Sequence, residues 1–137
     1  MSVLLLRHAR AGERAAWTGD DTLRPLDDRG LRQALALRDL AQRAIGRIVS
    51  SPYRRCVETV EPLAEALGIP IELDDRLAEG ASTQLALVLL GELDGGLACT
   101  HGDVIEAVLG YGLRKGAVAV TDVGPDGAVV LEALPAP

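Results

Sequence analysis

The chain has 137 residues, of which 48% are hydrophobic and 25% are charged. This length and balance predict one ordinary globular domain over residues 1–137, with a core that needs no disulfide or metal to fold. The net charge of −6 and the scarcity of aromatic residues argue against a nucleic-acid partner.

The charge is unevenly distributed along the sequence. Residues 1–55 carry 11 arginines and 6 acids, whereas residues 56–137 carry 3 basic residues and 14 acids. The simplest interpretation is a local anion site built from the first half of an acidic protein. Several of these arginines are instead expected to lie on solvent-exposed helix surfaces, namely Arg29, Arg32, Arg38 and Arg43.

Two features bear on the cellular setting. No apolar run is long enough to cross a bilayer, and the first residues lack the basic lead and cleavage site of a signal peptide. We therefore expect a cytoplasmic protein with no membrane partner. Cys56 and Cys99 have no metal-ligand spacing, and we expect them to be reduced and structural.

The sequence is organised around an aliphatic run, residues 3–6, that leads directly into Arg7 and His8. Such a run predicts a strand buried on both faces, as in a mostly parallel sheet. The only other histidine, His101, follows a second strand-like run over residues 96–100. Because ligands of parallel sheets collect beyond the carboxyl ends of the strands, both histidines are expected at one sheet edge.

A long loop is predicted directly after His8, since residues 9–23 have neither helical nor strand periodicity. Long loops in compact domains are usually functional, and this one could bring Arg10, Arg14 or Arg24 to a ligand. Asp27 is then a good N-cap for a helix over residues 28–44.

The next segment predicts a short strand over residues 47–50, followed by a helix. Ser51 supplies a capping hydroxyl and Pro52 a first helical residue, a pairing typical of helix starts. Pro62 lacks a backbone donor and predicts a kink or a division into two shorter helices.

The remaining elements alternate and then end in a hairpin. We expect an edge strand over 69–73, a helix capped by Ser82 that runs through Leu90, a helix over 103–110, and strands over 117–123 and 128–134 joined by a Gly-Pro-Asp-Gly turn. This order predicts a three-layer α/β/α sandwich with a mostly parallel central sheet and an antiparallel edge hairpin.

Four residues could converge at the sheet edge: Arg7, His8, Arg55 and His101. Guanidinium groups match the oxygens of a phosphoryl group, and nearby positive charge keeps an imidazole unprotonated and nucleophilic. This chemistry needs no metal, and no metal-ligand spacing is present, so we expect neither a metal nor another cofactor. The alternative is that both histidines are hydrogen-bonded core residues and Arg55 a helix-surface charge.

The motifs resemble those of the histidine phosphatase superfamily, whose fold is phosphoglycerate mutase-like. They occur in family order as Leu6-Arg7-His8-Ala9, Arg24-Pro25-Leu26 with Gly30 and Gln33-Ala34, Ser51-Pro52-Tyr53-Arg54-Arg55 through Thr59, Thr100-His101-Gly102, and Lys115-Gly116. The short chain, without room for inserted caps, is most similar to SixA-type phosphohistidine phosphatases and to the related domains attached to Nudix hydrolases.

The resemblance implies roles for individual residues. His8 would be the nucleophile that becomes phosphorylated, and Arg7, Arg55 and His101 would form the phosphate pocket. Glu79 lies where family mutases carry their general acid, although it is equally interpretable as an exposed loop glutamate. Arg54 falls outside the motif register and is expected to be a surface charge, and Ala9 replaces the usual glycine.

Three functions are compatible with these residues. The first is hydrolysis of phosphohistidine in a phosphorylated protein, as in SixA. The second is a phosphomonoesterase for a small metabolite or nucleotide. The third is a non-catalytic phosphate-binding regulatory module, against which the presence of all four pocket residues argues.

Overall fold

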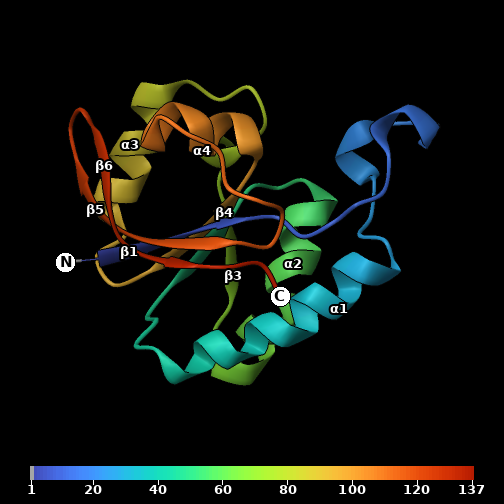
Figure 1. Cartoon of the computed structure of the whole chain (residues 1–137), viewed down its shortest axis with the longest axis horizontal. Helices are drawn as coiled ribbons and strands as arrows, with labels where there is room; N and C mark the ends of the chain where they lie inside the picture. Colours follow the sequence, from blue (N-terminus) through green and yellow to red (C-terminus); the bar gives the residue numbers. More distant parts are fainter. Residues whose placement is uncertain (1) are drawn as a thin grey trace.

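The computed structural model describes residues 2–137, which form a six-stranded sheet covered by helices on both faces (Figure 1). The strand order is β3-β2-β4-β1-β5-β6. Neighbours among β1, β2, β3 and β4 pair in parallel, and β5 and β6 continue the sheet antiparallel. The strands are β1 (Ser2–Arg7), β2 (Ile48–Ser50), β3 (Ile71–Leu73), β4 (Leu97–Thr100), β5 (Val118–Gly124) and β6 (Gly127–Leu134). The predicted three-layer α/β architecture is confirmed.

Four α-helices complete the layers: α1 (Asp28–Ala36), α2 (Arg54–Leu67), α3 (Thr83–Glu92) and α4 (Gly102–Leu109). Shorter 3-10 turns cover Arg14–Ala16, Asp21–Leu23, Leu37–Gln42 and Asp75–Leu77. Among residues 2–137, no helix has both the length and the apolar character required to traverse a bilayer.

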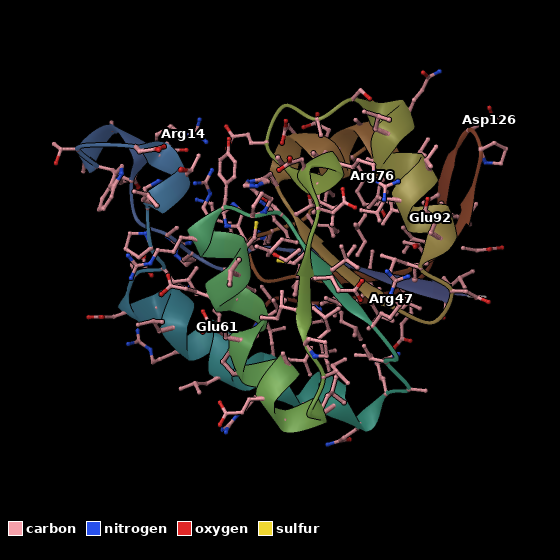
Figure 2. The ribbon with its side chains drawn as sticks, turned by 180° about the vertical axis from the view of Figure 1, so that it is seen from behind. Arg14, Arg47, Glu61, Arg76, Glu92 and Asp126 are labelled. Carbon is pink, nitrogen blue, oxygen red and sulfur yellow. The ribbon has the colours of Figure 1, made fainter. Side chains whose placement is uncertain are left out.

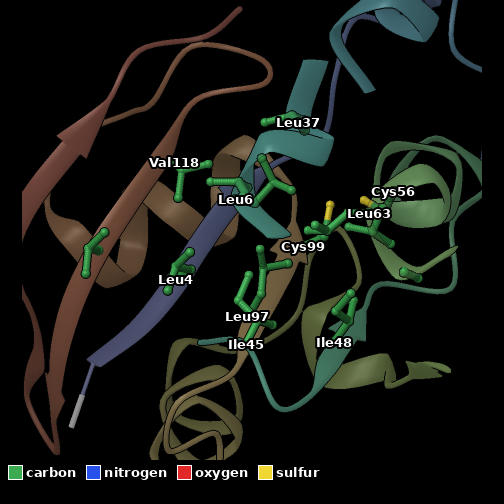
Figure 3. Close-up of a cluster of buried hydrophobic side chains, with 14 residues drawn as sticks. Leu4, Leu6, Leu37, Ile45, Ile48, Cys56, Leu63, Leu97, Cys99 and Val118 are labelled. Atoms are coloured by element: carbon green, nitrogen blue, oxygen red, sulfur yellow. The ribbon is translucent and has the colours of Figure 1, made fainter. Parts of the chain in front are cut away.

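Strand β1 lies at the centre of the core, and its side chains are buried on both faces of the sheet. Leu4 and Leu6 belong to the cluster that includes Leu63 of α2 (Figure 3). Val3 and Leu5 point to the opposite face of the sheet and pack in a second cluster, which includes buried residues of α3 and α4. An aliphatic run without polar alternation is therefore what this position requires.

The predicted helix over residues 28–44 is only partly correct. Asp27 caps it as expected, accepting a hydrogen bond from the Gly30 amide at 2.7 Å. The α-helix ends at Ala36, however, and a 3-10 segment follows. A 3-10 helix repeats every three residues, so Leu37 and Leu40 both face the core there.

Two further expectations around α2 are corrected in part. The helix begins at Arg54 instead of Pro52, and it continues through Pro62, so the division into two shorter helices is wrong. The helix tolerates the missing donor because its buried face, which includes Val60 and Leu63, packs against the sheet. Burial of these apolar side chains stabilises the fold by more than the one backbone hydrogen bond that Pro62 cannot donate.

The later elements follow the sequence closely. Ser82 caps α3 by accepting from the Leu85 amide at 3.2 Å, and the Pro125-Asp126 turn joins β5 to β6. The edge strand β3 begins at Ile71, two residues later than expected. Pro70, directly before it, has no N–H with which to extend the ladder.

Gly30 is required by the close approach of α1 to the segment after β1. A Cβ atom built on Gly30 would lie 1.9 Å from the Arg10 carbonyl oxygen. We predict that Gly30→Ala lowers the free energy of unfolding by about 1–3 kcal/mol, because backbone must move to relieve the overlap. Urea denaturation measures the effect.

Gly91 is the matched control, since it also lies within a helix. A Cβ atom there meets nothing within 4 Å. Gly91→Ala should leave stability unchanged or raise it by up to about 1 kcal/mol. Equal losses in the two variants would contradict the steric explanation.

Candidate active site

The parallel pairing of β1 with β4 brings the two histidines together. Arg7 lies opposite Thr100 in the register, and the His8 amide donates to the Thr100 carbonyl at 3.1 Å. His8 and His101 therefore leave the sheet side by side, with ring centroids 5.4 Å apart. The predicted meeting of the two histidines at one sheet edge is confirmed.

His8 presents an unprotonated nitrogen to the site. Its Nδ1 lies 2.8 Å from the Ala9 carbonyl oxygen, which can only accept, so the ring proton resides on Nδ1 and Nε2 keeps its lone pair. Burial lowers the pKa of His8 to about 3, the Ala9 bond opposes this shift, and electrostatic interactions with His101, Arg55 and Arg7 add to it. The imidazole is therefore neutral near pH 7, and its Nε2 lone pair is available for reaction.

Thr59 links the segment after β1 to helix α2. Its hydroxyl accepts a hydrogen bond from the Ala9 amide at 2.9 Å and donates to the Arg55 carbonyl at 2.6 Å. Ala9 is itself fully buried, and no described non-glycine residue has a positive φ, so alanine suits this position as well as glycine would. The threonine of the motif thus fixes the nucleophile relative to Arg55.

Arg55 is a fully buried cation held by acidic groups. Its Nη2 lies 2.5 Å from Glu79 Oε2 and 3.2 Å from Asp21 Oδ2, and its Nη1 donates to the Asp21 carbonyl at 2.9 Å. The guanidinium carbon also lies 4.9 Å from the centre of the Tyr53 ring. Asp21 was not anticipated from the sequence, because only the folded loop brings it to Arg55.

His101 is oriented by Ser51 from the end of β2. Ser51 Oγ lies 2.8 Å from His101 Nε2 and accepts from the Tyr53 amide at 3.2 Å. A Ser51 hydroxyl that donates to Nε2 places the His101 proton on Nδ1, the nitrogen that lies 3.7 Å from Glu79 Oε2. Ser51 is engaged here instead of capping a helix, which explains why α2 begins only at Arg54.

Arg7 lies along the first turn of α4. Its Nη1 donates to the Leu113 carbonyl at 2.7 Å. A Cβ atom on Gly102 would come within 2.9 Å of the Arg7 guanidinium carbon. The glycine after His101 therefore makes room for the arginine before His8.

Three buried nitrogens at this site have no hydrogen-bond partner within residues 2–137. They are Arg7 Nε, Arg55 Nε and His101 Nδ1. Unsatisfied buried donors are rare and need an explanation. All three belong to the residues predicted to hold a phosphate, whose oxygens would satisfy them. An open pocket of about 380 Å³ lies over Arg7, His8 and His101.

Glu79 lies inside this pocket, as expected for a candidate acid, and is held there by arginines. Besides Arg55 it contacts Arg14 at 2.9 Å, from the loop after β1 that Figure 2 shows projecting from the sheet. Its Oε2 is 3.7 Å from His101 Nδ1. Asp103 fixes the same loop by accepting from the Gly80 amide at 2.8 Å. In this geometry Glu79 acts as an acceptor.

The other candidate arginines lie elsewhere. Arg24 is buried and donates to the Ala11 carbonyl at 2.7 Å and to Asp21 at 2.9 Å, so it supports the loop. The Arg10 side chain lines a neighbouring hollow and does not line the 380 Å³ pocket. Arg54 is exposed and lies 3.6 Å from Glu58, in agreement with its expected surface position.

No metal centre accompanies the site. Within the described chain, no group of three or more His, Cys, Asp or Glu side chains is arranged to hold an ion. Cys56 and Cys99 are free, buried thiols, and Cys56 Sγ lies 3.5 Å from His101 Nε2.

Ser51 offers a test of how His101 is positioned. We predict that Ser51→Ala lowers kcat/KM for p-nitrophenyl phosphate by about fivefold, because one hydrogen bond of roughly 1 kcal/mol no longer fixes the His101 proton on Nδ1. Ser50→Ala is the control, since Ser50 is equally buried and its hydroxyl donates to the Ser51 carbonyl. Equal losses in the two variants would exclude a specific role for Ser51.

The low pKa of His8 also predicts a pH dependence of stability. Between its ordinary pKa of 6.5 and the folded value of about 3, the unfolded chain binds a proton that the folded chain does not. Stability should therefore fall with falling pH in this window, by about 1.4 kcal/mol per pH unit from this residue. His8→Asn should remove that part of the decline in denaturation experiments. Parallel declines in wild type and variant would contradict the prediction.

Comparison with known proteins agrees with this geometry. Residues 3–86 match the model of the histidine phosphatase superfamily (branch 1). The 8-oxo-(d)GTP phosphatase of Mycolicibacterium smegmatis is 32% identical over 131 residues, covering 90% of this chain and 41% of that protein. The chain thus spans about two fifths of the length of that relative.

Solved structures show the same fold. The protein histidine phosphatase SixA complexed with tungstate superposes with a TM-score of 0.79 at 18% identity, covering 98% of this chain and 97% of SixA. A SixA protein from Agrobacterium tumefaciens gives a TM-score of 0.77 at 26% identity, with 99% and 97% covered. Over half of the chain matches the family model, and Arg7, His8 and His101 of its motifs meet in one pocket: the chain belongs to the histidine phosphatase superfamily.

Proposed function

We propose that the protein hydrolyses the P–N bond of phosphohistidine in a phosphorylated protein, through a covalent phosphohistidine formed on His8. The observation that carries this proposal is the set of three unsatisfied buried donors, Arg7 Nε, Arg55 Nε and His101 Nδ1, beside the free Nε2 of His8. These groups suit a dianionic phosphoryl group and its transfer.

In the first step, His8 Nε2 attacks phosphorus. A bond forms between Nε2 and phosphorus while the substrate P–N bond breaks, and its electron pair stays on the departing imidazole. Arg7, Arg55 and the Nδ1 proton of His101 neutralise charge on the phosphoryl oxygens in the transition state. The imidazole leaves neutral when its second ring nitrogen carries a proton.

In the second step, water replaces the imidazole. Its oxygen bonds to phosphorus, the bond to His8 Nε2 breaks, and the water proton passes to solvent. Inorganic phosphate and neutral His8 result, and the donor set is unchanged. The route uses no metal ion, so EDTA should leave the rate unchanged.

Phosphohistidine is favoured over alkyl phosphates by the state of Glu79. An alkoxide leaving group needs a proton from an acid, whereas imidazole leaves without one. Both carboxylate oxygens of Glu79 accept from Arg14 and Arg55. The pocket is also open to solvent, which suits a phosphorylated side chain on a protein surface, and the fold likeness to SixA supports the same choice.

The alternative is a phosphomonoesterase for a nucleotide or another small metabolite. It is favoured by the relative named 8-oxo-(d)GTP phosphatase. It is also favoured by the Glu79 carboxylate in the pocket, which an ester substrate could use as an acid. Under this alternative, Glu79 must leave its arginine partners and deliver a proton to the ester oxygen.

A pair of variants tests the proposal. Wild type should form an acid-labile phosphoenzyme and release phosphate from a phosphohistidine peptide, and His8→Ala should do neither, because it lacks the attacking nitrogen. Glu79→Gln should keep phosphohistidine hydrolysis within about threefold, while any hydrolysis of alkyl phosphates that uses this acid falls by roughly 10²–10⁴. Initial rates on both substrates measure the effects.

A second comparison tests the phosphate contact of Arg55 with the variant Arg55→Lys, for which Arg54→Lys is the control. Arg55→Lys should be damaging, because an ammonium group cannot reproduce the two-pronged contact, and Arg54→Lys should be mild. A wild-type enzyme that cleaves alkyl phosphates efficiently and ignores phosphohistidine would refute the phosphohistidine proposal.

A further inference from the structure

A second cationic hollow lies beside the active site and takes no part in the chemistry described above. Its volume is about 530 Å³, and it is lined by Arg10, Arg29, Gln33, Arg114, Lys115 and residues 135–137. None of these residues lines the catalytic pocket. In Figure 1 the C-terminus, which forms one wall, lies beside α1.

The hollow is a built feature of the fold, because one buried side chain joins its walls. Gln33 of α1 accepts from the Arg10 amide at 3.0 Å and donates to the Lys115 carbonyl at 3.1 Å and the Pro137 carbonyl at 3.3 Å. The Gly116 amide in turn donates to the Arg7 and His8 carbonyls, each at 3.1 Å. The hollow is thus tied to the strand end that carries the nucleophile.

Its cations have no ion-pair partners. Within residues 2–137, the side chains of Arg10, Arg29, Arg114 and Lys115 form no ion pair, whereas Arg55 has two. The acids that interact electrostatically with them include Asp27, whose carboxylate already accepts from the Gly30 and Gly12 amides, and Glu13 near Lys115. Four cations against these two acids and the carboxylate of Pro137 leave a net positive region on a chain of net charge −6.

The occupant follows from charge and distance. His8 lines the catalytic pocket and Arg10, two residues further along, lines the hollow, so their Cα atoms are at most about 7 Å apart. A glutamate a few residues from a phosphohistidine can span this distance. A small phosphate compound bound at His8 would not fill a hollow that shares no wall with its pocket.

We infer that this hollow docks an acidic segment flanking the phosphohistidine of the protein substrate, an inference that rests on the proposed function. The net negative charge of the chain repels an acidic partner over most of the surface. The four cations attract it to the hollow and so orient it there. Such charge complementarity acts mainly on association and weakens as salt screens it.

Two synthetic peptides of equal length test the inference. Each carries one phosphohistidine, flanked by a run of glutamates in one peptide and by glutamines in the other. Wild type should hydrolyse the glutamate peptide with a kcat/KM roughly tenfold higher at low ionic strength, and the preference should shrink as salt is raised. The double variant Arg29→Ala/Arg114→Ala should lose the preference.

Arg38→Ala is the matched control, because Arg38 is an exposed arginine that lines a different groove, between α1 and α2. This variant should keep the full preference. No preference in wild type, or a preference that survives the double variant, would overturn the docking inference.

A direct binding measurement separates this inference from the proposed function. Fluorescence anisotropy with the unphosphorylated glutamate peptide needs no catalysis, and its Kd should rise about tenfold in the double variant and stay constant in Arg38→Ala. If wild type cleaved neither phosphopeptide, the proposed function would be wrong, while the anisotropy would still decide whether the hollow binds acidic segments. An unchanged Kd in the double variant would refute the hollow as that binding site.

Discussion

The active site depends on the parallel pairing of β4 between β1 and β2. Parallel strands end at the same edge, so three segments far apart in sequence are delivered to one place. Backbone bonds fix the alignment: the His8 amide donates to the Thr100 carbonyl, and the Ser51 amide donates to the Cys99 carbonyl at 3.0 Å. A slip of one residue in either pair would reverse the faces of all side chains beyond it. His8, His101 and the serine that lies against His101 are thus positioned by one sheet.

The second constraint is the burial of positive charge. Arg55 is fully buried, and an isolated guanidinium there would be costly. Glu79 and Asp21 supply compensating charge, so two carboxylates hold Arg55 in the absence of a ligand. A phosphate that binds Arg55 must share or replace these contacts. It also brings an acceptor oxygen for the Arg55 Nε atom, which neither carboxylate contacts.

The sequence predicted features that depend on local pattern and strand order. The buried spine of β1, the caps at Asp27 and Ser82, the hairpin and the meeting of the two histidines all follow from the strand and helix pattern. Ser51 was wrongly assigned to a helix cap because its competing partner, His101, is 50 residues away. The roles of Asp21 and Gln33 could not be predicted for the same reason: each depends on the path of a loop that carries no periodicity.

The two cationic sites differ in a way that separates their tasks. Arg55 is buried and paired, and the three donors offered to a phosphoryl group are buried, so low dielectric strengthens their interactions and salt has little access. The cations of the neighbouring hollow are mostly exposed and unpaired, so their field extends into solvent and is screened by salt. The first arrangement suits short-range stabilisation of a transition state, and the second suits selection of a partner before contact. Arg7 and Arg10, three positions apart on one segment, line the two different cavities.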